Sequence, residues 1–343
     1  MAVFSAHLQR WGSFFSDSGR RLGVVAWFSL KLKCNMKNLT GSIVFIRFFL
    51  TSVISLGALH APVQAQGPNL LSQVALILDV RTGESIYAKN ANTVTPIASI
   101  TKLMTAMVVL DAQQSLDQVL TVAVDDLDYL KASRSRLSIG SELSRREMLQ
   151  LSLMSSENRA ASALGRFYPG GLSAAVAAMN AKAKALAMVN THYFDTTGLS
   201  PQNVSTARDL AIMVQAAQGY PLIREYSTQP DQYVQIPATG QTLHYNNSNA
   251  LVKSGGWSIS LQKTGFIREA GRCVVMMAQI AQRPVVLVLL DSVGQFSRLG
   301  DAQRVKTWIE TGEVLAIPKP KAIVKKGVKS KRGKAVIVKK RRR

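Results

Sequence analysis

The most informative stretch of the chain covers residues 95–112 and reads TPIASITKLMTAMVVLDA. Thr95 is typical of a helix N-cap, and Pro96 is typical of the first helical position. The residues that follow favour helix, with apolar side chains such as Leu103 recurring on one side. The pattern predicts a helix over residues 97–112 that is buried in the folded protein.

This helix carries a pair of residues suited to nucleophilic catalysis. A serine hydroxyl is a poor nucleophile near neutral pH and needs a base within hydrogen-bond reach. Residues three apart share a helix face, so Lys102 is expected one turn above Ser99. Burial beside a second cation would lower the pKa of its amine, so that a neutral amine could take the proton. A chain of 343 residues contains about one S-x-x-K by chance, so this motif alone carries little weight.

Two further short motifs strengthen the evidence that Ser99 and Lys102 are catalytic. Ser156-Glu157-Asn158 lies at the break between two predicted helices, where its hydroxyl and amide could face a cleft or merely cap a helix. Lys263-Thr264-Gly265 begins a strand-rich region. There a lysine and a threonine could bind a carboxylate, and glycine lets a substrate backbone approach; a solvated strand end is the alternative. The order and spacing of the three motifs indicate one shared site.

Strand and helix patterns divide the chain into three zones. Alternating or continuous apolar runs predict strands over residues 74–80, 85–89, 271–281 and 284–290. Helical periodicity dominates residues 113–233, with helices predicted over 145–154, 160–167, 171–187 and 206–218, and a last helix is predicted over 296–311. Strands at both ends with helices between them predict one sheet, closed by N- and C-terminal segments, with a helical insertion.

The formal charge of +22 is concentrated at the ends of the chain. Residues 1–65 carry +6 and residues 318–343 carry +13, which leaves +3 for residues 66–317. The central domain, residues 66–317, therefore carries little net charge. The basic segment 318–343 is low in complexity and is predicted to be a disordered tail attracted to polyanions, or a merely solvated extension.

Residues 1–65 have the features of a leader with a secretory signal. The apolar run 48–61 is shorter than the roughly 20 residues that span a membrane, and Val63-Gln64-Ala65 supplies small residues for a signal peptidase. We expect export, cleavage after Ala65 and a natural translation start at Met36. N-terminal sequencing of a precursor that still contains residues 1–35 would contradict that start.

Cysteine and histidine are sparse beyond the leader. Cys273 is the one cysteine after residue 65, and His192 and His244 are the two histidines. We therefore expect no disulfide, no metal site rich in His or Cys, no cofactor and no Ser-His-Asp triad.

The three motifs together resemble those of the low-molecular-mass penicillin-binding proteins, the D-alanyl-D-alanine endopeptidases and carboxypeptidases. The similarity covers about residues 70–312 and includes the longer strings PIASITKLMT (96–105), MSSENRAA (154–161), TGLS (197–200) and WIETG (308–312). It implies an α+β fold of the β-lactamase/transpeptidase type, in which N- and C-terminal helices flank an antiparallel sheet with a nested all-helical subdomain. Within the family the chain is most similar to the endopeptidases, which lack a C-terminal β-domain, because only about 30 residues follow Gly312.

The resemblance implies a role for each motif residue. Ser99 is the acylated nucleophile, Lys102 is its base, and Ser156 passes a proton to the leaving amine. The substrate-binding residues are Asn158, Lys263, Thr264 and Gly265, and the backbone N–H groups of Ser99 and Phe266 form the oxyanion hole. Lys263 is also expected to help keep Lys102 neutral.

The expected partners are peptidoglycan peptides and β-lactam antibiotics, the latter as acylating inhibitors. The expected location is the periplasm, with contact to the inner membrane or an anionic polymer through the basic tail and no nucleic-acid partner. A carboxypeptidase that trims pentapeptides is the main alternative. A β-lactamase is disfavoured because no E-x-x-L-N string supplies a glutamate for deacylation, and a non-catalytic binder of anionic wall polymer remains a second class.

Overall fold

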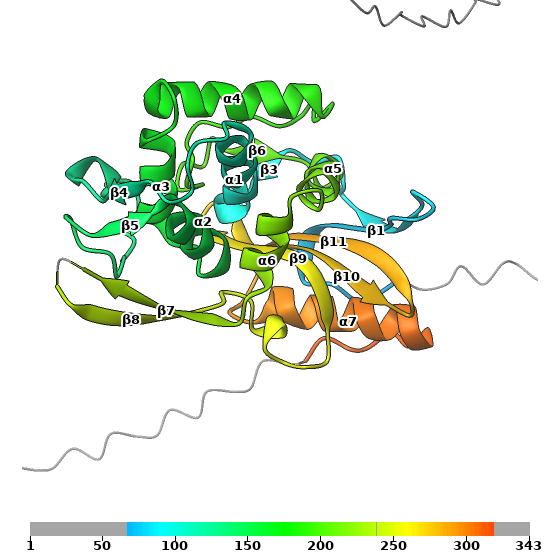
Figure 1. Ribbon diagram of the computed structural model, residues 1–343. Helices are drawn as coiled ribbons and strands as arrows, with labels where there is room; N and C mark the ends of the chain where they lie inside the picture. Colours follow the sequence, from blue (N-terminus) through cyan, green and yellow to red (C-terminus); the bar gives the residue numbers. More distant parts are fainter. Residues whose placement is uncertain (1–66, 238, 319–343) are drawn as a thin grey trace, which may run out of the picture. The chain divides into compact units, whose positions relative to one another are not determined.

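The computed structural model describes residues 67–237 and 239–318 (Figure 1). The predicted leader and nearly all of the predicted basic tail lie outside these residues. In the part of the chain that is described, no helix is long and apolar enough to cross a membrane.

A five-stranded antiparallel sheet forms the centre of the domain, in the order β2-β1-β11-β10-β9. Its strands are β1 (Ser72–Asp79), β2 (Ser85–Lys89), β9 (Ser258–Ile267), β10 (Gly271–Ile280) and β11 (Arg283–Ser292). The first strand pairs with the last, with Ala75 opposite Leu289. The predicted strands and the closure of the sheet by both ends of the domain are therefore confirmed.

Each face of the sheet is covered by different elements (Figure 1). Helix α7 (Ser297–Thr311) packs against β10, β11 and β1, and Val305 contributes to a small apolar core on that side. Helix α5 (Ala207–Ala217) packs on the opposite face against the same three strands. This second face also bears the rest of the helices, so it holds the larger core.

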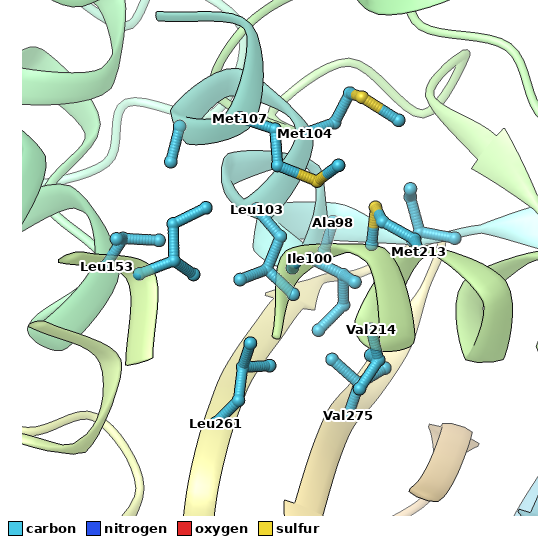
Figure 2. Packing of buried hydrophobic residues seen from close by; sticks show 14 of the residues in the cluster. Ala98, Ile100, Leu103, Met104, Met107, Leu153, Met213, Val214, Leu261 and Val275 are labelled. Atoms are coloured by element: carbon cyan, nitrogen blue, oxygen red, sulfur yellow. The ribbon is translucent and has the colours of Figure 1, made fainter. Parts of the chain in front are cut away.

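Helix α1 (Thr101–Asp111) is the centre of the helical subdomain. It contacts α2 (Arg145–Met154), α3 (Asn158–Arg166), α4 (Gly171–Ala185), α5 and α6 (Pro221–Thr228). Residues 101–109 are all buried, as expected for a helix that is surrounded on every side. Figure 2 shows Leu103 and Met104 among side chains from other helices, with Leu261 and Val275 from the sheet nearby.

The subdomain is not all-helical, which corrects the prediction. Two short antiparallel sheets flank it, β4 (Val119–Thr121) with β5 (Glu142–Ser144), and β7 (Asp231–Ile236) with β8 (Gln241–Asn246). In β7 the buried residues Val234 and Ile236 alternate with exposed Tyr233, which is a strand pattern too short to stand out from the surrounding helices. Helix α6 was also not predicted.

The start of α1 differs from the prediction too. Thr95–Pro96 is not a helix cap but the short strand β3, which pairs with β6 (Val204–Ser205). The helical stretch begins as a 3₁₀ turn, Ala98–Ile100, because distant backbone pairing overrides the local capping signal. The predicted helix over residues 97–112 is otherwise confirmed.

The α+β class of the fold is confirmed. Residues 67–71 lead into β1, and the N-terminal flanking helix that was expected lies outside the described residues.

Removal of a core side chain from the central strand should weaken the whole domain. Leu287 on β11 is fully buried, and Leu287→Ala should lower the free energy of unfolding by about 2 to 5 kcal/mol, because it leaves a cavity. Urea titration followed by circular dichroism measures the change. Val293→Ala is the control, since Val293 is 68% exposed and its truncation should change stability by less than about 0.5 kcal/mol. Equal midpoints for the two variants would contradict this account of the core.

Candidate active site

A cleft of about 880 Å³ lies where the helical subdomain meets the edge strand β9. It is lined by Ser99, Tyr129, Leu130, Lys131, Ala132, Ser133, Ser156, Asn158, Leu199, Thr264, Gly265, Phe266, Ile267, Arg268, Glu269 and Arg298. Residues from all three sequence motifs are in this set. The prediction that the motifs share one site is therefore confirmed.

Ser99 and Lys102 have the geometry that their spacing predicts. Ser99 lies in the 3₁₀ turn before α1, and Lys102 lies in the first turn of the helix. The Nζ atom of Lys102 is 2.9 Å from the Oγ atom of Ser99, and the lysine side chain is fully buried. Ala98 has a φ of 48°, and its carbonyl accepts a hydrogen bond from Thr101 Oγ1, which fixes the turn that presents Ser99.

Lys102 has two other acceptors besides the serine. Its Nζ atom donates to Asn158 Oδ1 at 2.8 Å and to the backbone carbonyl of Thr197 at 2.6 Å. A neutral amine has two N–H groups and one lone pair. When both N–H groups are bound to Asn158 and Thr197, the lone pair is left for the Ser99 hydroxyl. The site can therefore direct a base at the nucleophile.

Burial lowers the pKa of Lys102 to about 8, although the carboxylates of Asp195, Glu157 and Asp128 raise it in part. Half of the molecules therefore carry a neutral Lys102 near pH 8, within the range in which a general base works well.

Ser156 and Asn158 lie at the junction of α2 and α3. Ser156 has a φ of 64°, a strained conformation for a residue other than glycine, and it turns the chain so that its hydroxyl faces the cleft. Asn158 opens α3, and its Nδ2 atom donates to Ser133 Oγ at 2.8 Å. Glu157 caps the same helix by accepting from the backbone N–H of Arg159, and it is not among the cleft-lining residues.

The Lys263-Thr264-Gly265 motif lies on β9, the edge strand of the sheet, as its sequence context predicts. Lys263 is fully buried, and its Nζ atom donates to Ser156 Oγ at 2.8 Å. Burial, followed by the positive charges of Lys102 and Arg298, lowers the pKa of Lys263 well below its ordinary value. Because repulsion between two cations is mutual, protonation of one lysine disfavours protonation of the other.

The predicted substrate-binding residues differ in how they meet the cleft. Asn158, Thr264 and Gly265 line it, whereas Lys263 is directed to Ser156 and is not a lining residue. Gly265 lies so close to the nucleophile that an added Cβ would be 3.1 Å from the backbone nitrogen of Ser99. Ser99 and Phe266 both line the cleft, and the oxyanion-hole role of their N–H groups stays a prediction.

Three parts of the site have no counterpart in the sequence motifs. Ser133 contacts Asn158, the Thr197 carbonyl contacts Lys102, and Arg298 on α7 donates to the carbonyl of Gly265 at 3.2 Å. The Nε atom of Arg298 is buried and has no partner. The TGLS string was a sequence signal for Thr197, but a single serine in a loop and a single arginine in a polar helix gave none.

Gly198 should be indispensable for presenting Ser99. Its φ is 80°, and an added Cβ would lie only 2.0 Å from the carbonyl oxygen of Ala98, so Gly198→Ala must displace the nucleophile. We expect acylation of Ser99 by a fluorescent penicillin to slow by about 100-fold or more, since small misplacements of reacting groups have effects of that size.

Gly140→Ala is the matched control for this substitution. Gly140 has a φ of 84°, but nothing lies within 4 Å of its added Cβ, so it tests the backbone strain without the clash. Its substitution should lower stability by about 1 kcal/mol and leave acylation intact. Equal loss of acylation in both variants would contradict the role of the close contact.

Comparison with known proteins identifies the family. The D-alanyl-D-alanine carboxypeptidase family, peptidase family S11, matches residues 61–294. The D-alanyl-D-alanine endopeptidases of Pseudomonas aeruginosa and Escherichia coli are 48% and 47% identical to the chain. The alignments cover 82% of this chain and 92% of the first relative, and 75% and 83% for the second. The crystal structure of the Streptomyces K15 DD-transpeptidase matches with a TM-score of 0.66 and 27% identity, covering 71% of this chain and 98% of that one. The resemblance inferred from the motifs is thus confirmed, and the chain belongs to peptidase family S11, the D-alanyl-D-alanine carboxypeptidases.

Proposed function

We propose that the protein hydrolyses D-alanyl peptide bonds in peptidoglycan cross-links through an acyl-enzyme on Ser99. The observation that carries this proposal is the buried amine of Lys102, which is 2.9 Å from Ser99 Oγ and has two other fixed acceptors. Such an arrangement activates a serine without histidine. Family membership supplies the class of bond.

The first half of the reaction follows from these contacts. The neutral amine of Lys102 takes the hydroxyl proton while Ser99 Oγ attacks the carbonyl carbon of the scissile D-alanyl bond. The carbonyl oxygen becomes an oxyanion, for which the backbone N–H groups of Ser99 and Phe266 are the proposed donors, each contributing about 3 kcal/mol. When the C–N bond breaks, the leaving nitrogen needs a proton. Ser156, which is hydrogen-bonded to Lys263, is the proposed donor.

Deacylation completes the cycle with water. Water attacks the ester carbonyl and returns a proton to the Ser156–Lys263 pair, while the departing Ser99 Oγ takes back the proton held by Lys102, so that the acid and free Ser99 are released. Glu269 is the one carboxylate among the described residues that line the cleft, and it is paired with Lys131 at 2.6 Å. A cleft without a free carboxylate favours slow hydrolysis of a penicilloyl ester, as in an inhibited target and unlike a β-lactamase.

Substrate recognition is proposed to depend on the cations of the cleft. Arg298 and Thr264 both line it, and the guanidinium of Arg298 is the proposed partner for a carboxylate of the substrate. Lys263 would then act through its hydrogen bond to Ser156 and not by direct contact with the substrate, which refines the role implied by the resemblance.

Endopeptidase activity is favoured over carboxypeptidase activity by sequence similarity. The relatives named endopeptidase from P. aeruginosa and E. coli are 48% and 47% identical to the chain. A relative named carboxypeptidase from Streptomyces is 31% identical, and one from Bacillus subtilis is 28% identical.

The decisive experiment is incubation of the purified protein with cross-linked muropeptide dimers and with monomeric pentapeptides, followed by chromatography with mass detection. We expect dimers to be converted to monomers by the native protein and not by Ser99→Ala. Loss of only a terminal D-alanine would assign the carboxypeptidase instead. Rapid turnover of nitrocefin would favour the β-lactamase, and the absence of any Ser99-dependent product would refute the catalytic proposal.

We further propose that the protein acts in the periplasm and contacts an anionic surface through its tail. The support is the signal-like segment within residues 1–65 and the 13 basic residues of 318–343. Deletion of residues 318–343 should abolish co-sedimentation with anionic lipid vesicles or isolated cell walls at low salt, because the attraction is electrostatic. Unchanged sedimentation would discard the role of the tail, and a cell fractionation that finds the protein in the cytoplasm would discard the location.

A further inference from the structure

A tight loop behind the nucleophile is organised by one carboxylate. Asp195 accepts hydrogen bonds from three backbone N–H groups of its own loop, those of Thr197 at 2.7 Å, Gly198 at 2.5 Å and Ser200 at 2.7 Å. It also accepts from the Thr197 hydroxyl at 3.0 Å. One side chain therefore satisfies four donors of residues 197–200, each of which would otherwise need another partner.

Asn203 ties this loop to the segment that carries the nucleophile. Its Oδ1 atom accepts from the backbone N–H groups of Phe194 at 2.7 Å and Asp195 at 3.0 Å. Its Nδ2 atom donates to Thr101 Oγ1 at 2.9 Å, and its carbonyl accepts from the N–H of Ile97 at 3.0 Å. Asn203 is fully buried, so it transmits the position of the loop to both sides of Ser99.

The loop delivers two groups to the reacting pair. The carbonyl of Thr197 accepts from Lys102 at 2.6 Å, and the backbone of Gly198 packs directly on the peptide between Ala98 and Ser99. The Thr197 carbonyl is one of the two acceptors that leave the lysine lone pair for Ser99. Its placement therefore decides where that lone pair points.

We propose that Asp195 is a positioning residue for acyl transfer, which holds the Thr197 carbonyl so that Lys102 is aligned with Ser99. This inference rests on the proposed function, because it assigns a residue to the acylation step. Asp195 itself is not among the residues that line the cleft, so it acts through the loop and not on the substrate.

The carboxylate of Asp195 also acts on Lys102 through its charge. The charged groups around the amine are Asp195 on this loop, Glu157 at the start of α3, Asp128 on the loop before β5, and Lys263 on β9. The three carboxylates raise the pKa of Lys102 against the effect of burial, and Asp195 has the largest influence of the three. Removal of this negative charge should therefore lower the pKa of the base.

The test is the pH dependence of Ser99 acylation by a fluorescent penicillin in Asp195→Asn and Asp195→Ala. Acylation requires a neutral Lys102, so its rate rises with pH through the pKa of that amine, about 8 in the native protein. Asp195→Asn should move the midpoint to lower pH by about one unit, because it removes an anion, and should lower the plateau rate in part, because its amide nitrogen cannot accept the hydrogen bond from the Ser200 N–H. Asp195→Ala should in addition lower the plateau rate by about tenfold or more, because the loop loses its clamp.

Asp301→Asn is the matched control. Asp301 is another buried clamp carboxylate, which accepts from the backbone N–H groups of Leu71 at 3.0 Å and Ser72 at 2.7 Å, but it is not among the groups that shift Lys102. Its substitution should lower the melting temperature and leave the pH midpoint of acylation unchanged. Thermal unfolding of every variant separates loss of fold from loss of alignment. If Asp195→Ala does not fold, the plateau rate and the midpoint of Asp195→Asn together decide.

Acylation of Asp195→Asn with the native midpoint and plateau would overturn the inference while the proposed function stands. A midpoint shift of the same size in Asp301→Asn would overturn it as well, because the effect would then not be specific to the loop. A native protein that neither acylates at Ser99 nor cleaves muropeptides would instead refute the proposed function itself.

Discussion

A lysine amine without any exposed surface is the constraint around which the site is arranged. The amine of Lys102 contacts Ser99 in the turn before α1, Asn158 at the start of α3 and the carbonyl of Thr197 in the loop of residues 195–200. A buried amine without partners would be strongly destabilising, and these three segments supply the acceptors that it needs. The same contacts that make its burial tolerable also orient it, which means that stability and catalysis depend on one set of hydrogen bonds.

Lys263 is the second buried lysine of the site and lies on β9. Lys263 lies on the sheet and Lys102 lies on the central helix, so the two sides of the domain each contribute one amine to the same small volume. Mutual repulsion disfavours two protons there, and Ser156, held in a strained turn, contacts the amine of Lys263. Simultaneous protonation of Lys102 and Lys263 is therefore disfavoured. This suits a reaction in which a proton is first removed from Ser99 and later returned to it.

Local geometry explains which features the sequence could predict. The contact of Ser99 with Lys102 follows from helix periodicity, and strands β1, β2, β10 and β11 and most helices follow from apolar patterns. The pairing of Thr95–Pro96 with β6 could not be predicted, because a distant strand overrode a valid capping signal. The roles of Arg298 and of the loop around Asp195 could not be predicted either, because they arise from packing between segments that are far apart in the chain. The roles of Ser156, Lys263 and Phe266 in the reaction stay predictions drawn from the resemblance.

The pairing of the first strand with the last has a consequence for the order of events during synthesis. β1 and β2 are neighbours in the chain and pair as a hairpin, but the other side of β1 pairs with β11, which is made after the entire helical subdomain. Until then the hairpin presents an open, apolar edge of the kind that pairs with other chains. A nascent chain that stalls before residue 283 therefore cannot close its sheet, and a fragment of that length is expected to be a target for chaperones and proteases.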